Sequence, residues 1–463
     1  MIARIPLNPI SSTAQTRYSQ TMNRHPPAFP LHRLPYVTIR RSQPNIHRSP
    51  FRNPVAARAL RRFCMLFITI VMISVAVSVL IVPRILIERG TQVPDEYYEF
   101  IMQYSPHLYV TPGTGPDPRW GRAVSAAAFA IDFLYKAYHT PRFPKSRRPA
   151  IYEKIVSLAE FILTQQFVSD TGKSHYGAFR SNETSQYYYS VDATRAIPSL
   201  IRAYRLTGRS TYLDAAKRAG NRFLHAMQNS PALARRYGGF MRGVLAATDG
   251  SEVWLIDMDV ENLYGLIGLK MLVDHDPANK AAYNNMMTGL LSFLRYGLEN
   301  LYLYYSPPPI GDGGWHRVGQ HENEIYDDSL AYALLGTFDY EGWSKTVQQV
   351  YSSINTASGQ KSETWYNPSV CWAGYIDVVN RRPACDYYDG VTAGILSEIR
   401  RKHDRSSLDI SVQTIGKYRE RFMFWGVRFS DYSRVADSQA VVSVAWLSIL
   451  FLSYEEQKGF PWT

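Results

Sequence analysis

Tyr176-Gly177-Ala178-Phe179 is the first of five short stretches that combine glycine with an aromatic residue, and each is followed by acidic residues and an apolar helical pattern. The other four stretches are Tyr237-Gly238-Gly239-Phe240, Gly313-Gly314-Trp315-His316, Trp372-Ala373-Gly374-Tyr375 and Phe424-Trp425-Gly426-Val427. Gly177 and Gly239 are 62 residues apart, about twice the length of a simple helical-hairpin repeat. Each unit therefore has room for two helices and a substantial loop. Such a recurrence predicts helix pairs arranged around one shared pocket.

Hydrophobic spacing between these turns predicts helices that alternate between an apolar and an amphipathic type. No strand pattern of convincing length is found. Val441–Ser453 is a last apolar helix that needs a partner, which we expect from an earlier segment that closes a ring. We expect helices over Arg119–His139, Ala150–Phe167, Ser190–Leu206, Tyr212–Leu224, Val260–Val273, Ala281–Leu303, Ser329–Thr337, Trp343–Ile354, Gly390–Arg401, Leu408–Phe422 and Val441–Ser453.

Two residues mark the expected helix Ser190–Leu206 in particular. Gly208 follows its last residues and is a typical C-cap signal. Pro198 lies inside it, which predicts either a later start or a kink at that point.

The net charge of +12 is concentrated at the N-terminus. Residues 1–62 hold eleven arginines, no lysine and no acidic residue, and Arg84 also precedes the first acid, Glu88. The remainder of the chain is formally neutral, so the charge balance argues against nucleic acid as a partner. The composition of residues 1–62 is typical of a disordered tail, although an Arg-rich, acid-free leader also fits an organelle transit peptide.

Phe63–Val82 is an uncharged stretch of twenty residues followed by Pro83 and Arg84. At about 1.5 Å per residue it would reach roughly 30 Å, the thickness of a bilayer core. A buried core helix and a cleaved signal peptide are the two alternatives. The basic leader predicts that the N-terminus is cytoplasmic. The expected segments are a disordered cytoplasmic tail (1–62), a single transmembrane helix (63–83), a stem (84–114) with a helix near Tyr97, a helical domain (115–453) and a C-terminal tail (454–463).

The cysteines are few. Cys64 lies in the apolar stretch, and Cys371 and Cys385 are the two in the C-terminal domain. These two could pair in an oxidising compartment, remain free thiols or contribute to a metal site. The sequence leaves these alternatives open, and no complete metal-ligand pattern or nucleotide-cofactor motif is apparent.

The repeated turn with its following acid, together with Leu206-Thr207-Gly208-Arg209-Ser210-Thr211-Tyr212-Leu213-Asp214-Ala215-Ala216, resembles the (α/α)6 toroids of the six-hairpin glycosidase type. The resemblance covers residues 115–453 and implies an all-α fold. It further implies that the N-termini of the inner helices and their preceding loops line a cleft for a sugar chain. Members include glycoside hydrolases, uronyl hydrolases, polysaccharide lyases and uronyl epimerases, none of which this resemblance singles out.

Glycoside hydrolysis uses two carboxyl groups, one of which donates a proton. The acids at equivalent points of neighbouring repeats are the candidates: Asp259 and Asp328 first, then Asp192 and Asp389. Because Asp is also a favoured residue at helix N-termini, capping is the alternative explanation for each.

Residues 311–328 hold the highest density of reactive side chains in the chain. His316 could act as a base next to a uronate carboxyl, and Arg317 could hold that carboxylate. A solvated acidic turn is the alternative explanation. Aromatic residues near the turns could stack on sugar rings or simply pack the rim; they are Trp315, Trp254, Tyr188, Tyr326, Trp372, Tyr388 and Trp425.

These observations favour a membrane-anchored enzyme that hydrolyses a glycan through paired carboxylates, with its C-terminal domain lumenal or extracellular. The expected partners are a glycan or oligosaccharide and, through residues 63–83, the lipid bilayer; no cofactor is expected. The alternatives are a uronate epimerase or polysaccharide lyase, and a glycan-binding or assembly protein without catalysis.

Overall fold

The computed structural model describes residues 93–456, except for 259, 300–323, 349–374, 378–381, 384–386, 389, 404, 425, 429–432 and 435, together with Met65 and Thr69. The chain divides into two units, Met1–Met72 and Ile73–Thr463. In the first unit Met65 and Thr69 are helical, and the Thr69 hydroxyl donates to the Met65 carbonyl at 2.8 Å.

Among the residues that the structure describes, no helix has the length and apolar character needed to cross a membrane. Apart from Met65 and Thr69, the predicted tail (1–62) and the predicted span (63–83) lie outside the described residues. Cys371 and Cys385 also lie outside them.

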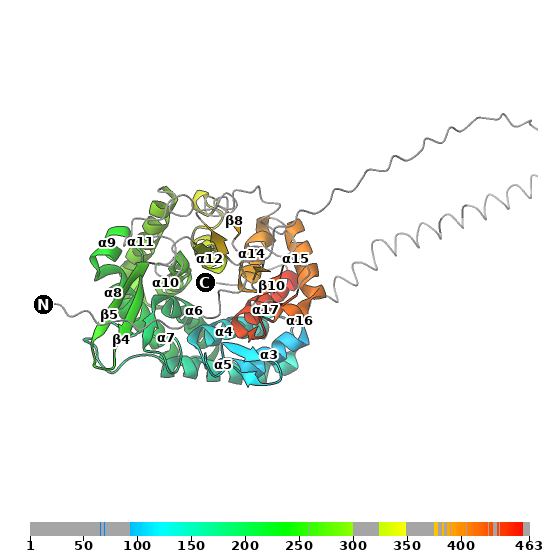
Figure 1. Cartoon of the computed structure of the whole chain (residues 1–463), viewed down its shortest axis with the longest axis horizontal. Coiled ribbons are helices and arrows are strands. Elements are labelled where there is room, and N and C mark those ends of the chain that lie inside the picture. The colour runs from blue at the N-terminus through cyan, green and yellow to red at the C-terminus, as the bar shows by residue number, and fades with distance from the viewer. Residues whose placement is uncertain are drawn as a thin grey trace, which may run out of the picture. The chain divides into compact units, whose positions relative to one another are not determined.

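Six helices of the second unit form a closed ring in which each helix packs against the next. Figure 1 shows the last of them, α17 in red, beside the first, α4 in cyan, and this contact closes the ring. In chain order the six are α4 (Val124–His139), α6 (Ser190–Thr207), α10 (Gly265–His275) with the 3-10 turn η4 (Val260–Tyr264), α12 (Asp327–Glu341), α14 (Gly390–His403) and α17 (Val441–Glu456).

A second set of helices covers this ring from the outside. Burial separates the two sets, because 13 of the 16 residues of α4 are buried, against 6 of the 17 residues of its partner α5. The alternation of apolar and amphipathic helices in the sequence predicted this division. The outer helices are α3 (Asp95–Tyr104) on α17, α5 (Arg148–Thr164) on α4, α7 (Ser210–Arg218) on α6, α11 (Lys280–Glu299) on α10 and α15 (Arg405–Lys417) on α14.

The partner expected for the last helix is α3. It buries Tyr97, Tyr98, Phe100 and Ile101, and the Tyr97 ring meets the Phe451 ring of α17 edge-on at 6.1 Å. The Tyr97 hydroxyl also donates to the Arg419 carbonyl at 2.6 Å. The segment predicted as a stem therefore supplies the outer helix of the sixth pair.

Helix α6 begins at Ser190 and continues through Pro198, so the later start considered from the sequence is wrong. It ends at Gly208, which has a left-handed conformation (φ +72°) and donates its N–H to the Tyr204 carbonyl at 2.8 Å. The predicted glycine C-cap is confirmed.

Two of the recurring turns are described in full, and their glycines contact the next outer helix in the same way. Gly177 (φ +86°) and Gly238 (φ +82°) lie so close to Arg218 of α7 and Gly289 of α11 that a side chain at either glycine would clash with the helix backbone. Gln166 Nε2 donates to the carbonyls of Gly177 and Ala215, both at 2.9 Å.

Gln228 repeats this arrangement one hairpin later. It lies in α8 (His225–Asn229), and its Nε2 donates to the carbonyls of Gly238 at 2.5 Å and Met286 at 3.0 Å. Gly177 and Gly238 therefore attach their turns to the outer layer.

In the part of the chain that the structure describes, four small antiparallel sheets accompany the helices, and the sequence patterns did not predict them. The longest strands, β4 (Met241–Ala246) and β5 (Glu252–Met258), pair with β3 (Tyr187–Tyr189), which leads directly into α6. The β4 sequence is interrupted by Gly243 and that of β5 is apolar over several consecutive residues, so neither shows a clear alternation. A second sheet contains β6 (Glu324–Tyr326), β7 (Tyr375–Asp377) and β8 (Arg382–Pro383). A third pairs β9 (Tyr387–Tyr388) with β10 (Val427–Arg428).

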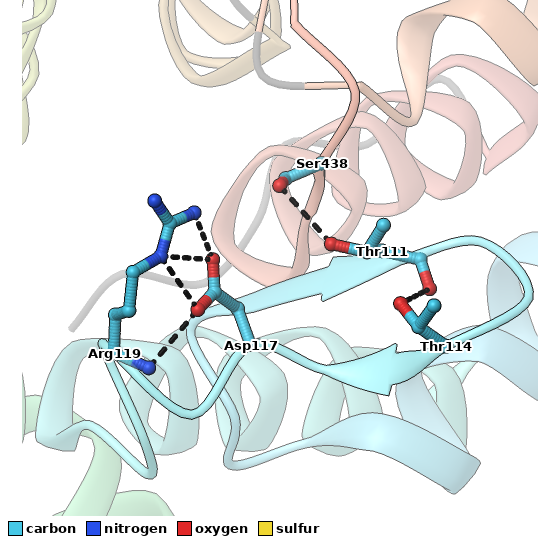
Figure 2. A network of polar contacts seen from close by, with 5 residues as sticks. All are labelled: Thr111, Thr114, Asp117, Arg119 and Ser438. Atoms are coloured by element: carbon cyan, nitrogen blue, oxygen red, sulfur yellow. Dashed lines mark hydrogen bonds and ion pairs between the residues drawn. The ribbon is translucent and has the colours of Figure 1, made fainter.

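The fourth sheet joins the two ends of the ring. Strand β1 (Tyr109–Thr111) pairs with β2 (Gly115–Pro116) on one side and with β11 (Gln439–Ala440), which leads into α17, on the other. Figure 2 shows this sheet, with the Thr111 and Ser438 hydroxyls 3.5 Å apart. Strands β3, β6, β9 and β11 each end where an inner helix begins, so the sheets gather at the N-terminal ends of the inner helices.

Candidate active site

A cavity of about 280 Å³ lies at the N-terminal ends of the inner helices. Residues of the inner helices α4, α6, α12, α14 and α17 line it, together with Glu261 of η4, the turn that precedes α10. The resemblance to (α/α)6 toroids implied a cleft at this place; among the described residues, those of the glycine-aromatic turns do not line the cavity. The lining residues are Leu108, Tyr109, Ser125, Ser181, Tyr189, Val191, Asp192, Arg195, Glu261, Tyr332, Val391, Ala440, Val442 and Ser443.

Asp192 lies in the first turn of α6 and is only 3% exposed. Burial raises the pKa of its carboxyl to about 6, although the nearby Arg195 charge and a hydrogen bond with Ser181 act in the opposite direction. Its Oδ2 atom has no hydrogen-bond partner among the described residues. Tyr189, not Asp192, is the N-cap residue of α6. Asp192 therefore lines the cavity without serving as the N-cap of its helix.

Arg195 lies one helical turn after Asp192 and forms an ion pair with Glu261 of η4. Its guanidinium carbon is 4.9 Å from the centre of the Tyr332 ring and 5.5 Å from that of Phe129, so two aromatic rings and a carboxylate fix its position. Glu261 is 3% exposed. The pair places a second carboxyl group at the wall of the same cavity.

The charges of the lining residues nearly cancel. Asp192 and Glu261 are the acidic residues and Arg195 the basic residue among the described residues that line the cavity. Because Arg195 is paired with Glu261, the wall is neutral when Asp192 is protonated and carries one negative charge when it is ionised. This part of the wall therefore has no cation in excess.

The structure describes two of the predicted catalytic residues, Asp192 and Asp328. Asp192 lines the cavity, and the backbone of Asp328 lies in the first turn of α12, at the start of an inner helix. Asp259, Asp389 and His316 lie outside the described residues, as do Trp315, Arg317, Trp372 and Trp425.

The predicted aromatic residues follow the strands. The backbones of Tyr326 and Tyr388 lie in β6 and β9, directly before inner helices. Tyr188 is buried with its ring 4.5 Å from His175, and Trp254 lies in β5 opposite Val244; neither lines the cavity. The neighbouring Tyr189 does line it, because successive side chains of a strand point to opposite faces.

Sequence reasoning did not identify Arg195, Glu261, Tyr109 and Tyr332 as cavity residues. Arg195 is three residues after Asp192 on a helix, a spacing that places both side chains on one face and could have signalled their association. For Glu261, Tyr109 and Tyr332 the position depends on contacts between distant segments.

The fold has counterparts among solved structures. Cellobiose 2-epimerase from Spirochaeta thermophila DSM 6192 is similar with a TM-score of 0.57 at 12% identity, over 81% of this chain and 97% of that one. A sugar epimerase from a ruminal bacterium gives 0.55 at 12% identity over 78% and 97%. An unsaturated glucuronyl hydrolase specific for heparin gives 0.51 at 12% identity over 80% and 96%. The chain thus has the (α/α)6 toroid fold of the six-hairpin glycosidase type.

The likeness to these structures is one of fold. No protein-family model and no curated protein matches the chain.

Proposed function

We propose that this protein is a carbohydrate-active enzyme that hydrolyses a neutral glycan within the cavity at the inner-helix N-termini. The observation that carries the proposal is the carboxyl of Asp192, a cavity-lining residue, which is buried and has a pKa raised to about 6. A carboxyl that holds its proton near neutral pH is the group that a glycosidase uses as its acid.

In this proposal Asp192 donates its proton to the glycosidic oxygen while the bond from that oxygen to the anomeric carbon breaks. Glu261 is the second carboxyl group, and Arg195 keeps it oriented. Glu261 accepts a proton from the water that attacks the anomeric carbon, so that one water is consumed for each bond cleaved. Asp259, Asp328 and Asp389 remain candidates for further carboxyl groups of the site.

A neutral substrate fits this wall better than a uronate. A uronate carboxylate would require a cation, and Arg195, the cation among the described lining residues, is already paired with Glu261. The alternative of uronate epimerisation or cleavage rested on His316 and Arg317, and no observation on the described residues favours it.

The test is a comparison of the full chain with its Asp192→Asn variant on neutral oligosaccharides of the cello, malto and manno series. The variant is expected to lose on the order of 100-fold or more in turnover, because Asn cannot donate the proton. The wild-type rate is expected to fall as pH rises above about 6, where Asp192 loses its proton. Equal turnover by both proteins would refute the role of Asp192. Isomerised sugar without chain cleavage would favour an epimerase, and binding without turnover a binding protein.

We also propose that residues 63–83 anchor the enzyme in a membrane, with residues 1–62 in the cytoplasm and the ring domain in the lumen or outside the cell. The support is the uncharged stretch Phe63–Val82 and the eleven arginines before it. Protease treatment of sealed vesicles from expressing cells provides the test. Protection of the C-terminal domain is expected, and its digestion from the cytoplasmic side would exclude this topology.

A further inference from the structure

Two of the large apolar side chains that are exposed to solvent contact residues of the cavity wall. In the described part of the second unit the exposed ones are Trp120, Val168, Tyr187 and Val253, and the two in contact with the wall are Trp120 and Tyr187. The Trp120 ring meets the ring of the cavity residue Tyr109 edge-on at 5.7 Å. The Tyr187 ring is stacked at 5.4 Å, and within 12° of parallel, on the ring of the cavity residue Tyr189. Each pair therefore connects the cavity wall with an exposed aromatic surface.

Trp120 is held on a fixed turn. The Asp117 carbonyl accepts from the N–H groups of Trp120 at 3.3 Å and Gly121 at 3.2 Å. The Asp117 carboxylate accepts from both the backbone N–H and the side chain of Arg119, as Figure 2 shows. The backbone N–H groups of three consecutive residues and the Arg119 side chain are thus bonded to a single residue, Asp117. The indole, 49% exposed, is presented to solvent by a backbone that has little freedom to move.

Tyr187 is held on a strand. It pairs with Leu245 of β4, which in turn pairs with the exposed Val253 of β5. Its N–H donates to Ser185 Oγ at 3.0 Å, and its carbonyl accepts from the Ser181 N–H at 3.2 Å. The side chains of Tyr187, Leu245 and Val253 therefore form a row across three strands, next to the position where Tyr189 enters the cavity wall.

The two aromatic pairs belong to one continuous rim. The segment that carries Trp120 and the segment that carries Tyr187 are joined by a bridge between Ala123 and Asn182 and by the ion pair of Arg122 with Glu183. Arg119 forms an ion pair with Asp117, and Arg122 forms one with Glu183. The positive charges of these two arginines are therefore balanced.

We propose that Trp120 and Tyr187 are sugar-binding platforms outside the cavity, so that the substrate is a neutral oligosaccharide whose chain continues from the cavity across this rim. Aromatic faces offer a large apolar surface to the C–H faces of sugar rings, and rigid aromatics lose little conformational entropy on binding. The balanced arginines suit a neutral chain. This inference rests on the proposed function, because it extends the same site.

The experiment measures binding of disaccharides and hexasaccharides of the cello, malto and manno series by calorimetry. The full chain with Asp192→Asn is used so that the sugars are not consumed. Added Trp120→Ala or Tyr187→Ala is expected to weaken binding of the hexasaccharide about tenfold, the effect of losing one aromatic contact, and to leave the disaccharide unchanged. Trp120→Phe is expected to recover most of the affinity. Val168→Ala is the control, because Val168 is equally exposed and does not line the cavity.

The outcomes separate this inference from the proposed function. If the sugars bind but Trp120→Ala and Tyr187→Ala do not change the affinity for the hexasaccharide, the two residues are not sugar-binding platforms. The catalytic proposal would remain intact. An equal loss for both chain lengths would also overturn them, since an outer platform affects only the longer chain. Failure of the wild-type chain to bind or turn over any of the sugars would refute the proposed function, and the platforms with it. Tighter binding of an oligouronate than of the neutral hexasaccharides would overturn neutrality of the substrate.

Discussion

Helix α6 carries two buried clusters of acids and an arginine that have similar composition and different surroundings. In the sealed cluster, Asp132 of α4 pairs with Arg202 of α6 at 2.7 Å, and both side chains are fully buried. In the open cluster, Asp192 lies beside Arg195 and Glu261 at the cavity wall. The α6 members are spaced by three, four and three residues, so they form one polar stripe; they are Asp192, Arg195, Ser199 and Arg202.

The partner of the arginine distinguishes the two clusters. Asp132 takes Arg202 as its ion-pair partner and also accepts a hydrogen bond from the Ser199 hydroxyl at 2.8 Å. In the open cluster Glu261 takes the arginine, and Asp192 forms no ion pair among the described residues. Burial is the main cause of a raised pKa for both Asp132 and Asp192. A raised pKa therefore does not by itself indicate chemistry; access to the cavity does.

The largest expected effect comes from the same substitution made in each cluster. Asp132→Asn should lower the free energy of unfolding by about 3–5 kcal/mol, because it leaves the buried Arg202 charge without its carboxylate partner. Asp192→Asn should not destabilise the protein at pH 7, because it removes a charge that burial disfavours. Urea denaturation of the full chain, followed by circular dichroism, measures both. A loss of less than about 1 kcal/mol in Asp132→Asn would mean that the sealed pair is not structural.

The next largest effect is the pH dependence of stability that Asp192 of the open cluster causes. The folded-state pKa of Asp192, about 6, lies above its ordinary value of 3.8, so the folded protein holds more protons than the unfolded chain between these values. Through this group the free energy of unfolding falls as pH rises from about 4 to about 7, by up to about 3 kcal/mol. Asp192→Asn lacks this dependence. The variant should equal the wild type in stability at pH 4 and exceed it at pH 7.

Denaturation midpoints of the two proteins at pH 4, 5, 6 and 7 provide the measurement. Other carboxyl groups titrate in both proteins, so their contribution cancels in the difference. A difference that stays constant over this range would show that Asp192 does not hold its proton in the folded state.

The helical ring could be predicted from the sequence because its signals are local. Apolar spacing within each helix and the recurrence of Gly177 and Gly239 need no knowledge of distant contacts. Even the closing partner of α17 could be expected, since an apolar helix must be covered. The sheets could not be predicted, because β4 and β5 lack alternation and depend on each other for pairing.

The open cluster was only partly predictable for the same reason. Asp192 is recognisable as an acid at the start of an inner helix. Glu261 becomes a wall residue through its ion pair with Arg195, a contact across 66 positions of sequence that no local pattern encodes. Tyr188 and Tyr189 cannot be distinguished by sequence alone because, without a recognised strand, the face to which each tyrosine points is unknown.

The smallest expected effect comes from two serines, one in each cluster. Ser199→Ala removes the hydroxyl that donates to Asp132, and it should cost about 1 kcal/mol of stability without moving the pH–rate profile. Ser181→Ala removes a hydrogen bond that lowers the pKa of Asp192. It should shift the upper limb of that profile to higher pH, because the carboxyl then keeps its proton longer, with a stability change of about 1 kcal/mol or less. Turnover of a neutral oligosaccharide between pH 4 and 8, beside urea denaturation, measures both properties. If Ser199→Ala moves the profile and Ser181→Ala does not, the sealed cluster and not the open one controls the reactive proton, and the comparison between them is reversed.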